Sequence, residues 1–289
     1  MGRSTWKFWA VAAAVACLAM AQPARADDAP VTKCTALEIC YCVNPKYLAA
    51  IDANVTRVRK VIRDNRAAGR TIGYLSVPLS PAGGGSYEIN SEAAKAIAGD
   101  VTKRFGPSSV YLLNPGAEGS DAMNGGSGAD YMYMWTQILE GTGNGEDFDF
   151  FYFAGPTDFS RYFLKPAKDA KDQTEEPARD RNQVDDYFGK LDEFFDRRVA
   201  SDEAFRKAVE AKQITKSGFR VYYGLRASVA FSLGSHDEWN IARLLNERRR
   251  GVEAFGIPNQ LSIFFDGQPV NPGNFESPAS SGDTGRCVK

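Results

Sequence analysis

Apolar and polar residues follow two different spacings along the central part of the chain. From Lys46 to Ala68, apolar residues recur at helical spacing with basic residues between them, which predicts an amphipathic helix that ends at Gly69. The segment from Thr71 to Leu79 is a short apolar run that ends among prolines, which is typical of a buried strand. Further helices are predicted over about 91–105, 129–140, 183–199, 201–213 and 236–250, and further strands over 108–113, 148–154, 219–232 and 261–265.

Strands that alternate with helices predict an α/β fold. We expect a mostly parallel, Rossmann- or flavodoxin-like sheet with helices on both faces, over about residues 71–266. A cysteine-rich segment and a helix (27–70) precede this domain, and an irregular tail rich in Gly, Pro and Ser (267–289) follows it. The pattern breaks over 156–218, which predicts a helical insertion with a charged, solvated loop over 165–182. The insertion is either a lid over the sheet or functionally inert.

The first 26 residues have the features of a signal peptide. Basic residues come first, an apolar run follows over 10–20, and the small residues at 24–26 form a cleavage site. We therefore expect an exported protein, periplasmic or secreted, that is cleaved near Ala26 and has no stable membrane insertion. A lipoprotein attached through Cys17 is the alternative.

Four cysteines remain once the signal peptide is removed. Cys34, Cys40 and Cys42 lie close together, and Cys287 lies near the C-terminus. An even number of cysteines in an exported chain predicts disulfides, and at least one of them should tie the C-terminus to the N-terminal segment. The sequence does not choose among the three connectivities. A metal site of four thiolates is the alternative, although the spacing matches no paired C-x-x-C pattern.

Charge and composition exclude several classes of function. The signal peptide carries three basic residues and no acids, so its removal lowers the formal net charge from −1 to −4. This charge gives no support to nucleic-acid binding. The single histidine, His236, excludes zinc and iron sites that need two or three histidines. We therefore expect carboxylates to act on a small-molecule substrate, with no metal and no cofactor. Whether the chain forms a homo-oligomer is left open.

Parallel sheets bind ligands beyond the carboxyl ends of their strands. This rule indicates four candidate ligand-binding loops, at 76–87, 114–130, 155–160 and 232–238. The last loop contains Glu238, which is predicted in the first turn of a helix, where the helix dipole keeps a carboxylate ionised and available as a nucleophile or base. The simpler interpretation is a capping box, in which Ser235 and Glu238 satisfy each other's backbone N–H groups. His236 is either a substrate contact or an exposed histidine of the capping loop.

A series of short motifs runs along about residues 71–266. In chain order they are Tyr74-Leu75-Ser76-Val77-Pro78, the strand and loop Val110–Pro115, the acids Asp130 and Asp147 or Asp149, the run Gly234-Ser235-His236-Asp237-Glu238-Trp239-Asn240-Ile241-Ala242, and the turn Gly256-Ile257-Pro258. The order of these motifs resembles the nucleoside 2-deoxyribosyltransferase family. Val77 and Asn240 depart from the family pattern, because glycines stand at both positions in the family.

This resemblance implies an activity and a set of site residues. In the family, the motif glutamate attacks the anomeric carbon of a deoxynucleoside and holds a glycosyl-enzyme intermediate, and the resemblance gives this role to Glu238. Such chemistry needs a second acid to protonate the leaving base, for which Asp158 is the first candidate, followed by Asp130 and Asp149. The residues expected to bind substrate are Tyr74, Ser76, Asn114, Asp130, Asp149 and His236. The alternative is a periplasmic binding or interaction protein on the same fold without the chemistry.

Overall fold

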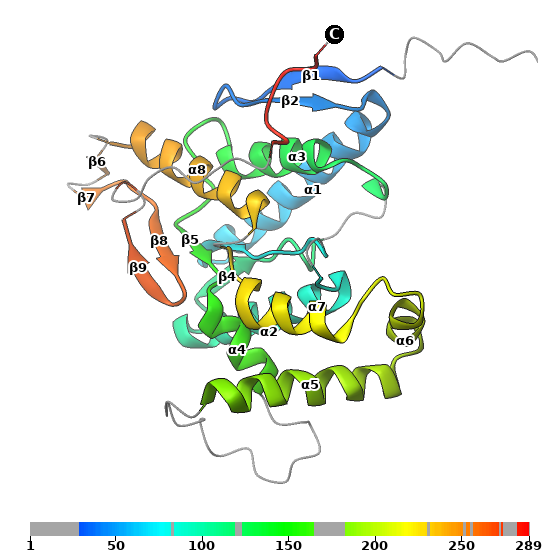
Figure 1. The fold of residues 1–289 in the computed structure, drawn as a ribbon. Coiled ribbons are helices and arrows are strands. Elements are labelled where there is room, and N and C mark those ends of the chain that lie inside the picture. Colours follow the sequence, from blue (N-terminus) through cyan, green and yellow to red (C-terminus); the bar gives the residue numbers. More distant parts are fainter. Residues whose placement is uncertain are drawn as a thin grey trace, which may run out of the picture.

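The structure is a computed structural model that describes residues 29–81, 84–118, 123–164, 183–229, 232–250, 253–254, 257–271, 273 and 282–288. Within these residues the chain forms eight α-helices and a five-stranded, mostly parallel sheet (Figure 1). The α/β class expected from the sequence is therefore confirmed. The expected signal peptide and the charged loop 165–182 lie outside the described residues.

The central sheet has the strand order β4-β3-β5-β8-β9. Neighbouring strands are parallel, except that β9 runs antiparallel to β8. The chain continues from β3 to β4 at one edge of β3 and then crosses to β5 at the other edge. The strand order therefore reverses at the position between β3 and β5. The strands are β3 (Thr71–Ser76), β4 (Val110–Leu113), β5 (Phe150–Phe153), β8 (Ser262–Phe265) and β9 (Gln268–Val270). A separate two-stranded pair is formed by β6 (Glu253–Ala254) and β7 (Ile257–Pro258).

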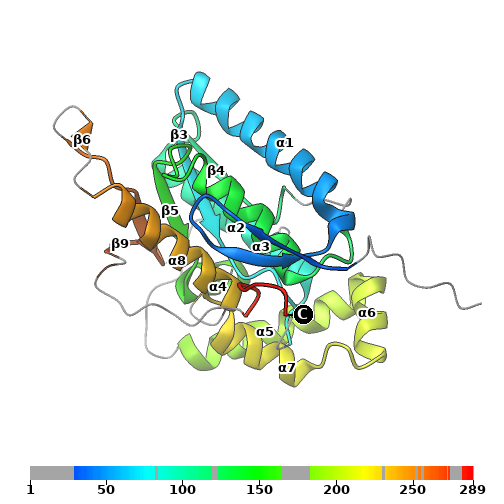
Figure 2. The same ribbon diagram turned by 90° about the horizontal axis from the view of Figure 1, so that it is seen from above.

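Helices cover both faces of the sheet, as expected (Figures 1 and 2). One face carries α1 (Leu48–Ala67), α3 (Gly128–Glu140) and α8 (Leu233–Arg248), and the other carries α2 (Tyr87–Phe105) and α4 (Pro156–Leu164). On the first face, Tyr74 of β3 contacts Trp135 of α3, with ring centroids 6.1 Å apart. On the second, Phe150 of β5 contacts Phe105 of α2, with ring centroids 5.5 Å apart.

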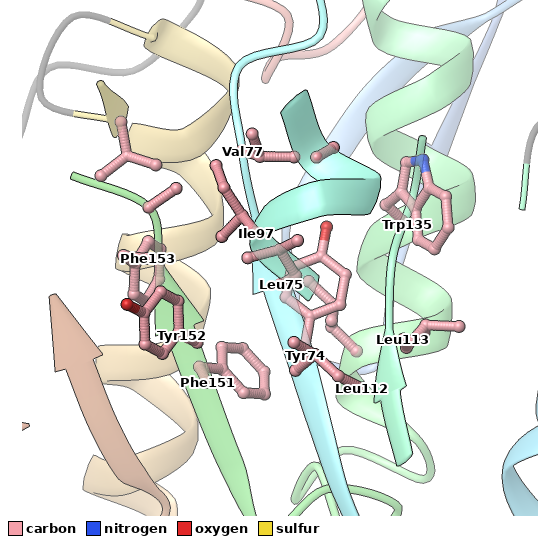
Figure 3. Close-up of a cluster of buried hydrophobic side chains, with 14 of the residues drawn as sticks. Tyr74, Leu75, Val77, Ile97, Leu112, Leu113, Trp135, Phe151, Tyr152 and Phe153 are labelled. Carbon is pink, nitrogen blue, oxygen red and sulfur yellow. The ribbon is translucent and has the colours of Figure 1, made fainter. Parts of the chain in front are cut away.

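The sheet core is aromatic because β5 is apolar on both faces. All four residues of this strand, Phe150 to Phe153, are buried, as is typical of a parallel strand between two helical layers. Figure 3 shows Tyr74 beside Phe151, and their ring centroids are 5.4 Å apart. The helical spacing of apolar residues in α1 puts them on one face of the helix. Ile51 and Ile62 lie on this face and are buried against the domain.

An N-terminal hairpin that the sequence analysis did not predict lies on the outer side of α3. Its strands are β1 (Val31–Cys34) and β2 (Cys40–Val43), and the 3₁₀ turn η2 (Pro45–Tyr47) leads from it into α1. The hairpin is bonded to α3 through side chains, because both carboxylate oxygens of Glu140 accept backbone N–H groups of Ala36 and Leu37, at 3.0 and 2.8 Å.

Two disulfides fix this hairpin. Cys34 is bonded to Cys40 across its strands, and Cys42 is bonded to Cys287, which brings the C-terminal segment against β2. The predicted link between the two ends of the chain is therefore confirmed, and the bridges replace the alternative of a four-thiolate metal site. Tyr41 and Thr284 also form an isolated antiparallel bridge beside the second disulfide.

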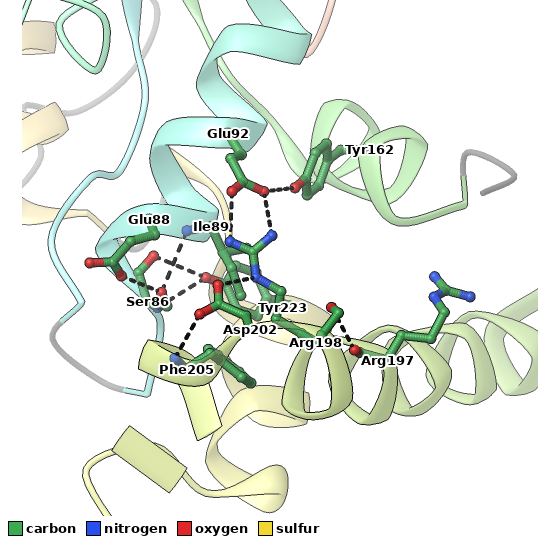
Figure 4. A network of polar contacts seen from close by, with 11 residues as sticks. Ser86, Glu88, Ile89, Glu92, Tyr162, Arg197, Arg198, Asp202, Phe205 and Tyr223 are labelled. Carbon is green, nitrogen blue, oxygen red and sulfur yellow. Dashed lines mark hydrogen bonds and ion pairs between the residues drawn. The ribbon is translucent and has the colours of Figure 1, made fainter. Parts of the chain in front are cut away.

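The segment expected as an insertion begins with α4, which was not predicted from the sequence. It continues with α5 (Gln183–Ser201), α6 (Glu203–Glu210) and the start of α7 (Lys216–Val221), which form an outer layer beyond α2 and α4 (Figure 1), and the π-helical turn η4 (Tyr222–Arg226) follows it. Figure 4 shows how it is attached to α2. Arg198 of α5 forms two hydrogen bonds to Glu92, at 2.7 and 3.0 Å, and Tyr162 of α4 donates a third at 3.1 Å.

The strand pattern expected over 219–232 is wrong. Phe219, Tyr222 and Tyr223 follow helical rather than alternating spacing, and all three are buried under α4 and α5. Their rings form the centre of an aromatic cluster in which the ring centroids of Phe219 and Tyr223 lie 4.5 Å apart.

Among the described residues, no helix is both long and apolar enough to span a membrane.

Candidate functional site

The start of α8 differs from the capping box considered in the sequence analysis. Ser232, not Ser235, is the N-cap residue, and its side-chain oxygen accepts the backbone N–H of Ser235 at 3.3 Å. Glu238 therefore lies in the second turn of α8, beyond the N–H groups that a cap satisfies. The capping interpretation of Glu238 is wrong, and its carboxyl group has a different set of partners.

The carboxyl group of Glu238 is held by two hydroxyl groups of β3. The Tyr74 hydroxyl donates to Oε1 at 2.5 Å, and the Ser76 hydroxyl donates to Oε2 at 2.5 Å. Tyr74 and Ser76 are two residues apart on one strand, so their side chains point to the same face of the sheet, toward α8. Glu238 is only 8% exposed, and Tyr74 and Ser76 are fully buried. This arrangement places a carboxyl group at the carboxyl end of β3, where the chain reverses across the sheet.

Burial sets the protonation of Glu238. Desolvation raises its pKa to about 7; the hydrogen bonds from Ser76 and Tyr74 oppose this rise, and the charge of Asp237 adds to it. Within the described part of the chain, Glu238 forms no ion pair. The Tyr74 hydroxyl stays protonated, because burial and the neighbouring Glu238 carboxyl raise its pKa well above the usual value. The site thus holds a carboxyl group that exchanges its proton near neutral pH.

Asp158, the expected partner of Glu238, is held on the other face of the sheet. Its carboxylate accepts the Tyr152 hydroxyl at 3.0 and 3.1 Å and the Gly155 N–H at 3.1 Å. Tyr74 pairs with Phe151 in the sheet, so Tyr152, the next residue of β5, points away from the face of Tyr74 and Glu238. Burial, and the nearby Asp266, raise the pKa of Asp158 to about 6. The structure does not bring the two carboxyl groups together.

Asp130 and Asp149 are held by the protein's own backbone. The Asp130 carboxylate accepts the N–H groups of Asn44 and Ser127, both at 2.8 Å, and completes a capping box at the start of α3. Asp149 precedes β5, at the amino ends of the strands, where it accepts the Ile72 N–H at 2.7 Å. Asp149 and Glu238 therefore lie at opposite ends of the strands.

The other expected site residues lie at the carboxyl edge of the sheet. Asn114 follows β4 directly and is buried, and its Oδ1 accepts the Gly116 N–H at 2.9 Å. His236 lies in the first turn of α8 and is half-buried. Tyr74 and Ser76 were expected to bind substrate, whereas in this structure both hydroxyl groups bind Glu238.

Two features of this edge were missed from the sequence. Asp266, after β8, accepts the N–H groups of Thr157 and Asp158, at 3.3 and 3.2 Å, and so caps α4 from another part of the chain. Val229 donates its N–H to Ala154 at 3.1 Å, which places the segment before α8 across the end of β5. The dipeptide Asp266-Gly267 is a turn signal in the sequence, but nothing in it indicates which helix Asp266 would cap.

Comparison with known proteins finds no family model that matches this chain, and no curated protein or solved structure that matches it significantly. Within the described residues, no group of three or more His, Cys, Asp or Glu side chains is placed to hold a metal ion. The candidate site therefore stands on its own geometry, which consists of Glu238, its two hydroxyl donors and the strand ends that surround them.

Proposed function

We propose that this protein is an enzyme that cleaves or transfers an N-glycosidic bond of a nucleoside-like small molecule, with Glu238 as the nucleophile. The observation that carries the proposal is the environment of the Glu238 carboxyl group. This group is buried, accepts hydrogen bonds from two hydroxyl groups and has its pKa raised to about 7. Carboxyl groups with strongly perturbed pKa values cluster at functional sites, which supports this assignment.

The position of Glu238 in the fold supports the proposal. The five strands follow the order of a flavodoxin-like, doubly wound sheet, in which ligands bind at the carboxyl ends of the strands where the strand order reverses. Here that position lies between β3 and β5. Ser76 ends β3, and the carboxyl group it holds comes from α8, so Glu238 lies at the edge where such sheets bind their ligands.

The proposed reaction has two steps. A carboxylate oxygen of Glu238 forms a bond to the anomeric carbon while the bond to the base breaks, and the base leaves with the electron pair and takes up a proton from solvent. Water or a second base then attacks the same carbon, loses a proton to solvent and releases the Glu238 carboxylate. Tyr74 and Ser76 orient the carboxylate and stabilise its charge. Asp158 points away from this face, so it does not serve as the acid for the leaving base.

The disulfides support the expected location. Disulfide bonds such as Cys42–Cys287 persist in oxidising compartments, and this agrees with an exported, periplasmic or secreted protein. A small-molecule substrate fits the formal charge of −4 without the first 26 residues better than a nucleic acid does.

A second candidate function is a binding or interaction protein that lacks catalysis. The observation in its favour is the low exposure of Glu238, which at 8% leaves little of the carboxyl group open to a substrate. In that case the two hydrogen bonds to β3 attach α8 to the sheet and have no chemical role. The two functions differ in the turnover they predict. An enzyme loses turnover on a conservative substitution of Glu238, whereas a binding protein has no turnover to lose.

The test is base release from a panel of ribo- and deoxyribonucleosides and nucleotides, with and without a second base as acceptor. Glu238→Gln keeps the size of the side chain and removes the nucleophile, so we expect it to lower turnover by about a thousandfold or more. Glu247→Gln, an exposed position on the same helix, is the matched control and should keep full turnover. No turnover of any substrate by the natural protein, or equal turnover in Glu238→Gln, would show that the proposal is wrong.

A further inference from the structure

A cavity of about 640 Å³ lies on the α2 and α4 side of the sheet, away from Glu238. Its walls come from the last turn of α2, the first two turns of α4 and the turn between β8 and β9. Two arginines, Arg104 and Arg161, line it together with Asp266 and residues of the β8–β9 turn. A concave site of this size, mostly apolar with a few charged groups, is the usual form of a small-molecule pocket, for which volumes of about 300–1,000 Å³ are typical.

The acids near this cavity are already bonded to the backbone. Asp266 accepts two N–H groups at the start of α4, where the helix dipole favours a negative charge. Asp158, beneath it, accepts the Gly155 N–H and the Tyr152 hydroxyl. Most hydrogen bonds to these carboxylates therefore come from fixed groups of the protein and not from the arginines.

The two arginines, by contrast, have little bonding of their own. Arg104 makes no hydrogen bond and no ion pair with any described residue, and it lies exposed at the end of α2. Arg161 has one ion-pair contact, to Asp158, with a nitrogen–oxygen distance of 4.0 Å. Two guanidinium groups that line one cavity, with few hydrogen bonds to the described protein, match the oxygens of a carboxylate or a phosphate group.

We infer that this cavity binds a small organic oxyanion, a carboxylate or a phosphate ester, through Arg104 and Arg161. The rest of the ligand lies against the β8–β9 turn, where Thr157 and Gln268 provide polar contacts. The inference does not depend on the proposed reaction, since α2 and α4 pack on the face of the sheet opposite to Glu238.

The test is calorimetric titration of the full chain in a buffer without phosphate, at fixed ionic strength. The probes are phenyl phosphate, benzoate and benzyl alcohol, which share an aromatic body and differ in charge. We expect at least one of the two oxyanions to bind and benzyl alcohol not to bind. Tighter binding of phenyl phosphate would indicate a phosphate ester as the natural ligand, and tighter binding of benzoate would indicate a carboxylic acid.

Substitutions locate the binding in the cavity. Arg104→Gln and Arg161→Gln should each lower the affinity for the oxyanion by about tenfold, because each removes a charged pair of donors. Arg63→Gln, an exposed arginine on α1 at the other face, is the matched control, and Glu238→Gln should also bind normally. Thermal unfolding of each variant verifies that it is folded. No binding of either oxyanion, equal binding of benzyl alcohol, or unchanged binding in both cavity variants would overturn the inference.

Discussion

Two buried glutamates, Glu140 of α3 and Glu238 of α8, each accept two hydrogen bonds, but from different kinds of donor. The donors to Glu140 are backbone N–H groups of the N-terminal hairpin. The donors to Glu238 are the hydroxyl groups of Tyr74 and Ser76. Both side chains are less than a tenth exposed, so the difference lies in the donors and not in the depth of burial.

The difference determines what each carboxyl group is able to do. A backbone N–H only donates, so Glu140 must present an acceptor at both oxygens to hold the hairpin. A hydroxyl group either donates or accepts, so the partners of Glu238 suit both the carboxylate and the protonated acid. Glu140 is therefore a fixed attachment between two elements, whereas the surroundings of Glu238 permit a change of protonation or of bonding.

The largest expected effect is the pH dependence of stability at Glu238. Its pKa is about 7 in the folded protein and 4.5 as the ordinary value, so between these pH values the folded state binds more protons than the unfolded state. The Glu238 contribution to stability is therefore present below pH 4.5 and is lost as the pH rises to about 7. Glu238→Gln does not titrate, so its free energy of unfolding relative to the natural protein should rise by up to about 3 kcal/mol between pH 4.5 and 8.

Urea unfolding at the two pH values measures this change, and Glu247→Gln is the control for the loss of one carboxyl group. The difference in the free energy of unfolding between Glu238→Gln and the natural protein should change with pH. A constant difference would contradict the raised pKa of Glu238 and remove the contrast with Glu140.

Glu140→Gln should behave in the opposite way. An amide retains one acceptor oxygen, but its NH₂ group meets a backbone N–H where the carboxylate accepted one. We expect a loss of about 2 kcal/mol in the free energy of unfolding. Hydrogen exchange should show increased exchange of the Ala36 and Leu37 amides. A variant that is as stable as the natural protein would show that the hairpin does not depend on this carboxylate.

The smallest expected effects concern the hydroxyl donors. Tyr74→Phe and Ser76→Ala each remove a hydrogen bond that lowers the pKa of Glu238, so each variant should titrate at a higher pH than the natural protein. The loss of stability should be about 1 kcal/mol for each variant. The midpoint of the pH dependence of unfolding reports the shift, and a midpoint that moves to lower pH would show that these hydroxyl groups do not stabilise the carboxylate.

Much of the fold could be predicted because its strongest signals are local. The helix over Leu48–Ala67 and the buried strands β3 and β5 follow from the spacing of apolar residues alone. The strand expected over 219–232 was wrong because Phe219, Tyr222 and Tyr223 favour strands as residue types, whereas their spacing of three and four positions is helical. The hairpin β1–β2 was missed because strands of four residues give a weak alternating signal.

The candidate site could be predicted only in part. The motif that contains Glu238 indicated a carboxyl group at the strand ends, but Ser232 and Ser235 are both plausible caps by residue type, and the structure was needed to choose between them. The separation of Asp158 from Glu238 depends on which face of β5 Tyr152 occupies, and that depends on the register with β3. The strands β3 and β5 are parallel and joined by a long connection, so no short turn fixes their register locally in the sequence.

The most direct test of Glu238 as the nucleophile is the mass of the protein during turnover. The natural protein is mixed with a nucleoside that it cleaves, quenched with acid within the first turnovers and measured intact, and the modified peptide is then identified. We expect the mass of one glycosyl group on the peptide that contains Glu238, and no added mass on Glu238→Gln. Turnover without a covalent adduct, or an adduct on any other residue, would contradict the role of Glu238.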